Sequence, residues 1–566
     1  MARFKAYAVD LETTGLDPRK DRILGLGYHQ SDTNEGFLTK PEEIQAFLNN
    51  CVEDNIWLIW QGGKFDQVFL LQNTGILHPN TFDTLLAASI LPKRPPNLKL
   101  DTLVSHYFKI PPYKEQELLK DMGAVPIETV KEYCLTDCKY TMMVARHLYP
   151  QILEQNLWSF YSEVLLPISS MLAEVEHKGM AIDREALSQQ FIKLSLEIEN
   201  LKDSLRIKHQ ALIGPWEAAN PKKKFNFNSP KQVLWLVKEQ LKLPCKNTKG
   251  KESTQSDVLE KYVDEHEVIR DILDLKEKIK LNGFLADWEK GLDTKGRLHT
   301  HYNLDIARTG RLSSSDPNLQ QVPRGPTRSL FIAKDKDHSL VIIDYAQIEP
   351  RIVAHYSEEP VLLQAFRDDD DFYSVVLIQM LDLKYTPQEL KNTKPELRAL
   401  AKTISLAILY GIGPSKLAAF MSKGLKKSIG YRQACSYIEG YFRNIPGFAA
   451  MRDRFQQEAL DTGKVVNLLG RPVYMLPEEV YHKAVNRQIQ SSASDLCCYS
   501  QLKLKEQIKE MDAVLVHLVH DEVIYEVAKK DVDKFTIIAK DVMENCFPLN
   551  VPLKVEVSVG QNWGCK

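Results

Sequence analysis

Residues 341–355 read VIIDYAQIEPRIVAH, and this stretch predicts a buried strand followed directly by a helix. The apolar run VII is typical of a strand inside a sheet, and EPRIVAH has the apolar spacing of a packed helix. Asp344 stands at the end of the strand, where a carboxylate can reach a metal ion at the sheet edge. A second such acid follows in residues 514–527, VLVHLVHDEVIYEV, which predict two strands joined by a tight turn at His520, Asp521 and Glu522.

These two acids, Asp344 and Asp521, are the minimal ligand set for two divalent ions at a nucleoside triphosphate. Phosphoryl transfer also requires positive charge, and residues 396–413, ELRALAKTISLAILYGIG, supply it. The pattern predicts a helix over 395–411 with one stripe of Arg398, Lys402, Leu406 and Tyr410, spaced every four residues. The same spacing also fits two solvent-facing cations followed by two core residues, so periodicity alone leaves both interpretations open.

A separate set of acids lies near the start of the chain. Asp10 and Glu12 are two residues apart on a predicted strand and therefore project from one face. Asp66 follows an apolar strand, and Tyr133 and Asp137 share one face of a predicted helix. Four carboxylates from separate segments suit a pair of hard divalent ions. The set predicts metal-assisted phosphodiester hydrolysis, with Tyr133 orienting the attacking water.

Composition agrees with several folded domains. The chain has 566 residues, 44% of them apolar and 26% charged, which excludes a disordered or collagen-like protein. The net charge of −2 excludes a protein whose whole surface is basic and binds nucleic acid. Because we find no long apolar run and no signal peptide, we expect a cytoplasmic protein that is not secreted and does not enter a membrane. Nine scattered cysteines predict reduced, buried thiols.

One local stretch departs from this neutral balance. Residues 221–251 contain nine lysines and one acid, Glu239, with Phe225, Phe227 and Trp235 among them. Such a stretch predicts contact with a phosphate backbone, and a solvated surface loop is the alternative. The acidic run at 368–371 is interpreted as an exposed loop between helices.

Seven longer motifs lie between about Phe225 and the C-terminus. They are FNFNSPKQ, DTKGRLHTHYN, TGRLSSSDPNLQQVPRG, VIIDYAQIEPRIVAH, the RxxxKxxxLxxxYG helix, AVNRQIQSS and LVHDEVIYEV. With these motifs, this part of the chain resembles the polymerase half of family A DNA polymerases, the bacterial DNA polymerase I and phage replicase group. Residues 1–150 resemble the tyrosine-bearing DEDD 3′-5′ exonucleases, with Gly62 in place of their usual Asn.

The resemblance implies an α/β and α+β multi-domain chain without a preceding 5′ nuclease, which favours a replicative phage-type or stand-alone polymerase. A ribonuclease-H-like exonuclease domain (1–155) would be followed by a right-hand polymerase. Its expected parts are the thumb with connecting helices (156–299), the palm (300–360 and 481–566) and the fingers (361–480). The implied activity is template-directed DNA synthesis in replication with proofreading. The alternatives are an exonuclease whose polymerase half only binds DNA, and a non-catalytic scaffold.

The resemblance also implies roles for single residues. Asp344 and Asp521 would hold two Mg²⁺ ions, with Mn²⁺ able to substitute, beside a supporting Glu522. Asp10, Glu12, Asp66 and Asp137 would hold two more. Arg398 and Lys402 would bind the triphosphate, with Lys402 donating a proton to pyrophosphate. Glu349 and Tyr410 would exclude a 2′-hydroxyl. The expected DNA contacts are Arg311, Asn318, Gln320, Asn486, Gln490 and His520.

Three departures from the family pattern concern the nucleotide site. Leu406 stands where Phe or Tyr is usual, Tyr373 where His is frequent, and Pro350 where Leu is usual. Pro350 is tolerable at the start of a helix, where no intrahelical donor is lost. The expected partners are primer-template DNA, deoxynucleoside triphosphates and replication accessory proteins, with the chain acting as a monomer.

Overall fold

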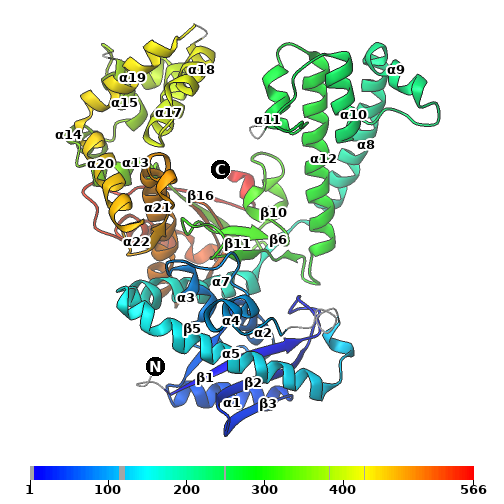
Figure 1. Ribbon diagram of the computed structural model, residues 1–566, viewed down its shortest axis with the longest axis vertical. Coiled ribbons are helices and arrows are strands. Elements are labelled where there is room, and N and C mark those ends of the chain that lie inside the picture. The colour runs from blue at the N-terminus through cyan, green and yellow to red at the C-terminus, as the bar shows by residue number, and fades with distance from the viewer. Residues whose placement is uncertain (1–4, 114–120, 248–249, 382, 426–427) are drawn as a thin grey trace. The chain divides into compact units, whose positions relative to one another are not determined.

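The computed structural model describes residues 5–113, 121–247, 250–381, 383–425 and 428–566 (Figure 1). Several side chains inside the helices, including that of Leu406, lie outside the described part. The chain forms two compact units. The first comprises Met1–Gly179, Thr300–Val322 and Ala333–Lys566, and the second comprises Met180–His299 and Pro323–Ile332. This division does not test the domain boundaries expected from sequence.

The N-terminal part of the first unit is built on a five-stranded sheet of order β3-β2-β1-β4-β5. Strand β1 pairs antiparallel with β2 and parallel with β4. The strands are β1 (Ala6–Thr13), β2 (Ile23–Ser31), β3 (Asn34–Leu38), β4 (Trp57–Trp60) and β5 (Thr81–Asp83). Four short apolar runs, AYAVDLE, RILGLGYH, EGFLT and IWLIW, predict strands between residues 6 and 60, and they form β1, β2, β3 and β4.

Helices cover this sheet, and the long helix α5 (Ile127–Glu154) packs against β1 and β2 (Figure 1). The others are α1 (Pro41–Glu53), α2 (Lys64–Thr74), α3 (Thr84–Ser89) and α4 (Leu100–Phe108). The sequence predicts helix over 81–90, but this is wrong for its first three residues. Thr81, Phe82 and Asp83 form a buried edge strand, and the Asp83 carboxylate then caps α3 through the amides of Leu85 and Leu86.

The C-terminal part of the first unit contains a four-stranded antiparallel sheet of order β14-β15-β11-β16. Its strands are β11 (His338–Tyr345), β14 (Ala513–Val519), β15 (Glu522–Ala528) and β16 (Val555–Gly560). Residues Leu340–Ile343 are buried on both faces, which explains their unbroken apolar sequence. The predicted strand at 341 and the predicted hairpin at 514–527 are both confirmed.

Three helices belong to this part of the unit: α13 (Ile348–Ser357), α21 (Val480–Gln507) and α22 (Val532–Glu544). Helix α22 packs against β11, β15 and β16, and α21 packs against α13 and α22. Pro350 occupies the third position of α13, still within the first turn, where it removes no intrahelical hydrogen bond. Helix α5 is followed in the chain by three helical elements. They are α6 (Trp158–Phe160), the π-helical turn η3 (Tyr161–Leu165) and α7 (Leu166–Lys178). Helix α7 contacts both α2 and α21, so it joins the two halves of the first unit.

A helical segment lies between α13 and α21. It comprises α14 (Pro360–Arg367), α15 (Phe372–Leu381), α16 (Pro387–Thr393), α17 (Pro395–Leu409), α18 (Pro414–Leu425), α19 (Tyr431–Asn444) and α20 (Pro446–Thr462), then strands β12 (Lys464–Val466) and β13 (Pro472–Tyr474). Five of these helices begin with proline, whose fixed φ suits the first helical position. Helix α17 is predicted over 395–411 and ends at Leu409, shortly before Gly411 adopts a φ of 80°.

The second unit pairs two long helices, α8 (Arg184–Lys208) and α12 (Glu267–Gly291). It also contains α9 (Gln210–Ala219), α10 (Pro230–Trp235), α11 (Ser256–Leu259) and the sheet β10 (Phe331–Ile332), β6 (Met180–Ile182) and β7 (Arg297–Leu298). Phe225 and Phe227 are fully buried and pack on each other. They are therefore core residues rather than contacts for a nucleic acid. Lys249 of the basic stretch lies outside the described residues.

The cysteines and the membrane prediction can be compared directly with the structure. All nine cysteines are free and seven are buried, as expected, but Cys435 is half-buried and Cys565 is exposed. Within the described part of the chain, every helix is either too short or too polar to cross a lipid bilayer.

Candidate active sites

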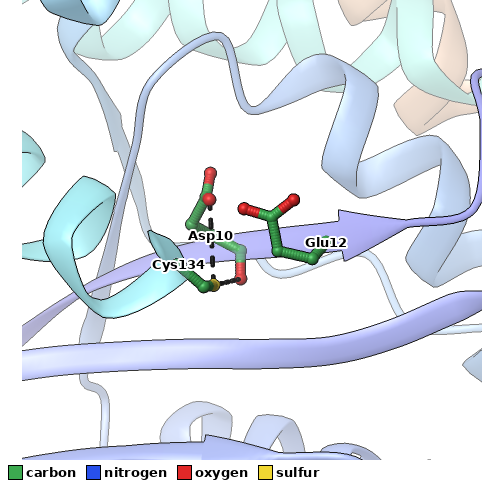
Figure 2. Close-up of side chains that lie close together, drawn as sticks. All are labelled: Asp10, Glu12 and Cys134. Carbon is green, nitrogen blue, oxygen red and sulfur yellow. Dashed lines mark hydrogen bonds between the residues drawn. The ribbon is translucent and has the colours of Figure 1, made fainter. Parts of the chain in front are cut away.

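Two of the N-terminal acids, Asp10 and Glu12, lie close together on strand β1 (Figure 2). Asp10 and Glu12 lie two residues apart on β1, so their side chains share a face, as predicted. Asp66 lies in the first turn of α2, and its Oδ1 accepts a hydrogen bond of 3.2 Å from the backbone amide of Leu11. Burial and the neighbouring charge of Asp10 raise the pKa of Asp66. The structure therefore brings the three acids together.

Helix α5 adds the remaining members of this site. Tyr133 and Asp137 both lie on α5, as predicted, and Asp137 is buried. The hydroxyl of Tyr113 donates a hydrogen bond of 2.6 Å to Asp137 Oδ1. Burial and the charge of Asp137 raise the pKa of Tyr113, so this phenol remains a donor.

A thiol lies against the same carboxylates. Figure 2 shows Cys134 beside Asp10, and its Sγ lies 3.5 Å from the Asp10 carbonyl oxygen and 3.8 Å from Oδ2. Ligand atoms of Asp10, Glu12 and Cys134 all lie within 4.8 Å of one another. Gly27 makes this packing possible, because a Cβ at residue 27 would lie 2.6 Å from the Cys134 sulfur. Burial raises the pKa of Cys134.

The second acid cluster forms where β11 meets the β14–β15 hairpin. Asp344 pairs with Glu522 across β11 and β15, and the amide of Tyr345 donates to the Asp521 carbonyl at 3.2 Å. Burial and the charge of Asp344 raise the pKa of Asp521 to about 6. The two predicted aspartates, which are far apart in sequence, therefore interact in the fold. His520, in the turn, adopts a left-handed φ of 57°.

A cation that the sequence analysis does not single out meets this cluster. Lys566 Nζ donates hydrogen bonds to Asp344 Oδ2 and, at 2.7 Å, to Glu522 Oε2. Glu522 also accepts a hydrogen bond of 2.8 Å from the indole nitrogen of Trp563. Glu522 is buried, and both of its oxygens accept hydrogen bonds.

Glu349 lies at the centre of a second set of contacts. It accepts hydrogen bonds from the guanidinium of Arg311 and from the hydroxyl of Tyr410, one on each carboxylate oxygen. Burial and the Glu349 charge raise the pKa of Tyr410, which keeps its hydroxyl protonated. Glu349 and Tyr410 are thus brought together, while Arg311, expected to contact DNA, pairs with Glu349.

The cationic stripe of α17 faces α15. Arg398 donates hydrogen bonds of 3.0 Å from Nε and 2.6 Å from Nη2 to Asp371 Oδ1. Lys402 Nζ lies 6.0 Å from the ring centre of Tyr373, whose pKa burial raises to about 12. Asp371 also binds the amide and hydroxyl of Ser374 at the start of α15. The interpretation of residues 368–371 as an exposed loop is therefore wrong for the buried Asp371.

The remaining predicted DNA contacts lie on loops and on α21. Asn318 caps a short turn by accepting from the Gln320 amide, and the Gln320 side chain donates to the Leu518 carbonyl at 3.3 Å. Asn486 and Gln490 lie on α21 and are half-buried. Asn486 Oδ1 is shielded from solvent, and no donor among the described residues reaches it. The structure positions these side chains without testing their contact with DNA.

Four residues of these sites are missed by the sequence analysis as site members: Tyr113, Cys134, Asp371 and Lys566. Cys134 is adjacent to Tyr133, and Asp371 ends a conspicuous acidic run, so neighbouring residues offered a signal for both. Tyr113 follows two prolines in a loop, and Lys566 is one of many lysines. Only the tertiary fold brings Tyr113 and Lys566 into contact with carboxylates.

A five-stranded α/β part and a four-stranded antiparallel sheet, each with its own acid cluster, define a multi-domain protein with two carboxylate sites. A family model described as DNA polymerase family A matches residues 196–565, and one described as a 3′-5′ exonuclease matches residues 1–153. The chain belongs to DNA polymerase family A.

Three similar proteins are bacterial DNA polymerases I. The thermostable DNA polymerase I of Thermus filiformis is 33% identical over 438 residues, covering 74% of this chain and 50% of that protein. DNA polymerase I of Caldicellulosiruptor bescii is 31% identical over 510 residues, covering 86% and 55%. That of Synechocystis is 29% identical over 619 residues, covering 98% and 59%. The chain thus spans between about half and three fifths of the length of these relatives.

A solved structure has the same fold. It is described as the POL domain of Pol1 from M. smegmatis in complex with DNA primer-template and dNTP. The TM-score is 0.85 at 24% identity, over 99% of this chain and 96% of that one. The expected combination of an exonuclease domain and a family A polymerase fold is confirmed.

Proposed function

We propose that this protein is a template-directed DNA polymerase that extends a primer 3′ end and proofreads it with a 3′-5′ exonuclease. The observation that carries the proposal is the meeting of Asp344 and Asp521 at the β11–β15 pairing. In the same unit, α17 presents Arg398 and Lys402. Carboxylates for metal ions and cations for a triphosphate are the two parts that nucleotidyl transfer needs. Primer-template DNA and deoxynucleoside triphosphates are the proposed substrates.

The donor sets at both sites fit hard divalent ions, with Mg²⁺ the proposed ion and Mn²⁺ able to substitute. Asp344 Oδ1 is shielded from solvent and has no donor among the described residues, as expected of an oxygen that accepts a cation. Asp344 and Asp521 would hold ions at one site, and Asp10, Glu12, Asp66 and Asp137 at the other. Bound ions supply an activated oxygen nucleophile and neutralise charge that develops at phosphorus.

The side chains around the polymerase carboxylates take the remaining roles. Arg398 would bind the triphosphate, oriented by its two hydrogen bonds to Asp371. Lys402 is exposed beside the Tyr373 ring, and its ammonium would donate a proton to departing pyrophosphate. Glu349 and Tyr410, joined by a hydrogen bond, would form the wall that excludes a 2′-hydroxyl. Sugar discrimination by Leu406 concerns a side chain outside the described residues.

At the exonuclease site, neutral groups would hold the acids while Tyr133 orients the attacking water. The Leu11 amide holds Asp66 and the Tyr113 hydroxyl holds Asp137. Because these donors fix the carboxylates before substrate arrives, less reorganisation is needed during the reaction.

The proposed organisation follows from these sites. The exonuclease would occupy residues 1–155, the palm 300–360 and 481–566, and the fingers 361–480. The thumb with its connecting helices would lie within 156–299, largely in the second compact unit. The phage-type assignment stays a prediction from sequence, since the relatives described above are bacterial. The monomeric state and the accessory partners also stay predictions.

Primer extension in Mg²⁺ tests the polymerase function directly. Asp521→Ala should abolish extension because it removes one of the two metal-binding aspartates. Equal extension by the variant and the wild type would remove the assignment. For proofreading, the double variant Asp10→Ala with Glu12→Ala should extend normally and leave a mismatched primer intact. Continued degradation by that variant would assign hydrolysis to another site.

A further inference from the structure

The last seven described residues fold back onto the polymerase carboxylates. Strand β16 ends at Gly560, where a Cβ would lie 2.5 Å from the Cβ of Cys565, so only glycine allows this close return. The Asn562 side chain then accepts a hydrogen bond of 2.9 Å from the Gly564 amide and caps the short turn Trp563–Cys565. The segment 560–566 therefore has a defined conformation.

Trp563 anchors this segment to the hairpin that carries Asp521. Its side chain is 1% exposed, and its ring packs edge-on against His517 of β14 at 5.5 Å between ring centres. Its indole nitrogen donates to Glu522 Oε1. A buried tryptophan with its polar atom paired is a strong anchor, so the residues that follow are aimed from a fixed point.

Because Trp563 is held in place, the ammonium of Lys566 lies against two acids, Asp344 and Glu522. Lys566 Nζ donates to Asp344 Oδ2 and to Glu522 Oε2. Its side chain is 24% exposed, while that of Glu522 is 7% exposed, so solvent screens this contact only partly. The contact places one positive charge among Asp344, Glu522 and Asp521, whose charges otherwise repel one another.

We propose that Lys566 is a tethered cation that holds the polymerase carboxylates while no metal ion is bound, and that an incoming divalent ion displaces it from Asp344. This inference rests on the proposed metal-binding function of Asp344 and Asp521. Nothing in the family resemblance stated above assigns a role to residue 566.

Sharing one carboxylate has a measurable consequence. A divalent ion held by Asp344, whose Oδ1 has no donor among the described residues, would lie close to the ammonium on Oδ2. The two cations repel each other, so their binding free energies are coupled with opposite sign. Loss of the ammonium should therefore tighten metal binding, by about 10-fold within the roughly 5- to 150-fold range usual for such coupling. It should also destabilise the metal-free protein, because the clustered acids lose their counter-charge.

Mn²⁺ titration, with the free ion followed by electron paramagnetic resonance, tests the inference on the 566-residue chain without DNA or nucleotide. All variants carry Asp10→Ala and Glu12→Ala, so that the exonuclease site contributes little binding. Lys566→Gln should bind Mn²⁺ about 10-fold more tightly than its parent. Lys566→Arg keeps a cation, so its affinity for Mn²⁺ should stay within about twofold of that of the parent. Lys540→Gln removes an exposed lysine from α22 and should leave binding unchanged.

A second measurement uses the melting temperature. Lys566→Gln should melt below its parent without metal and show the larger rise when Mn²⁺ is added, because tighter binding stabilises the folded state more. Unchanged or weaker Mn²⁺ binding by Lys566→Gln, including no binding by either chain, would overturn the inference. Failure of the proposed function gives a different result, namely primer extension by Asp521→Ala equal to that of the wild type.

Discussion

The two acid clusters of this chain differ in what holds them. In the N-terminal cluster two of the contacts come from neutral donors: the Leu11 amide on Asp66 and the Tyr113 hydroxyl on Asp137. In the polymerase cluster cations also take part, with Lys566 on Asp344 and Arg311 on Glu349, beside the neutral donors Trp563 and Tyr410. Neutral donors position an acid and leave its charge available to a metal ion. Cations also neutralise it, so under the proposed function this cluster would have to exchange partners in order to bind metal and substrate.

The two cations of α17 also differ in what holds them. Arg398 is paired with the buried Asp371, whereas Lys402 is exposed and lies over the Tyr373 ring. Under the proposed function the arginine would therefore be held by the protein before the triphosphate arrives, and the lysine would be available for proton transfer. Two cations four residues apart on one helix would thus act at different stages of the reaction.

The largest expected effect separates these two cations. Lys402→Ala should lower kcat for single-nucleotide incorporation by roughly 100- to 1000-fold, since general acid catalysis is usually worth that much. The KM for the nucleotide should change far less. Steady-state incorporation kinetics measure both, with the exposed Lys391→Ala on α16 as a control. A rise in KM at constant kcat would assign Lys402 to binding alone.

The next effect concerns the neutral donors of the exonuclease site. Tyr113→Phe removes the hydroxyl that holds Asp137 and should slow primer hydrolysis about 10-fold, the usual worth of a hydrogen bond to a charged group. Extension should be unaffected. Tyr140→Phe is the matched control, because its ring packs on Tyr113 at 4.6 Å. Equal hydrolysis by Tyr113→Phe and wild type would show that Asp137 needs no such support.

A smaller effect tests whether Asp371 prepares Arg398 for substrate. Asp371→Asn keeps the shape and removes the charge, and should raise the KM for nucleotide about 5-fold by loosening the guanidinium. Hydrolysis of a mismatched primer should not change. Asp368→Asn, three residues earlier and exposed, provides the control in the same kinetic assay. A lower KM would instead mean that Asp371 competes with the triphosphate for Arg398.

The smallest effect tests charge pairing at the base of β11. His338 lies between Asp335 and Asp512; burial opposes its charge, but the hydrogen bonds to these carboxylates raise its pKa above 6.5. A raised pKa adds stability that is full below pH 6.5 and is lost as the pH rises through the higher value. His338→Gln should therefore lower the free energy of unfolding by up to about 1 kcal/mol near pH 5.5. Near pH 9 the same substitution should change the free energy of unfolding very little.

Urea unfolding at the two pH values measures that difference. His482→Gln, an exposed histidine on α21, should show no comparable pH dependence. A cost for His338→Gln that is equal at both pH values would point to packing instead of charge.

Much of the fold is predictable because local pattern and burial agree. The continuous apolar run of β11, the hairpin around His520 and the helix with Tyr133 and Asp137 each follow from side-chain spacing alone. Where the pattern is ambiguous the prediction fails. The short strand at Thr81 precedes a helix, so its three residues are interpreted as helical, and the buried Asp371 is hidden in a run of exposed acids.

The sequence by itself determined the family, the order of the two acid sets and the identity of their carboxylates, because these depend on residue type and local spacing. Only the tertiary structure decided the partners. Tyr113 and Lys566 reach Asp137 and Asp344 across 24 and 222 positions of the chain. No local periodicity encodes a contact between such distant residues, because packing of strands and helices fixes which side chains meet.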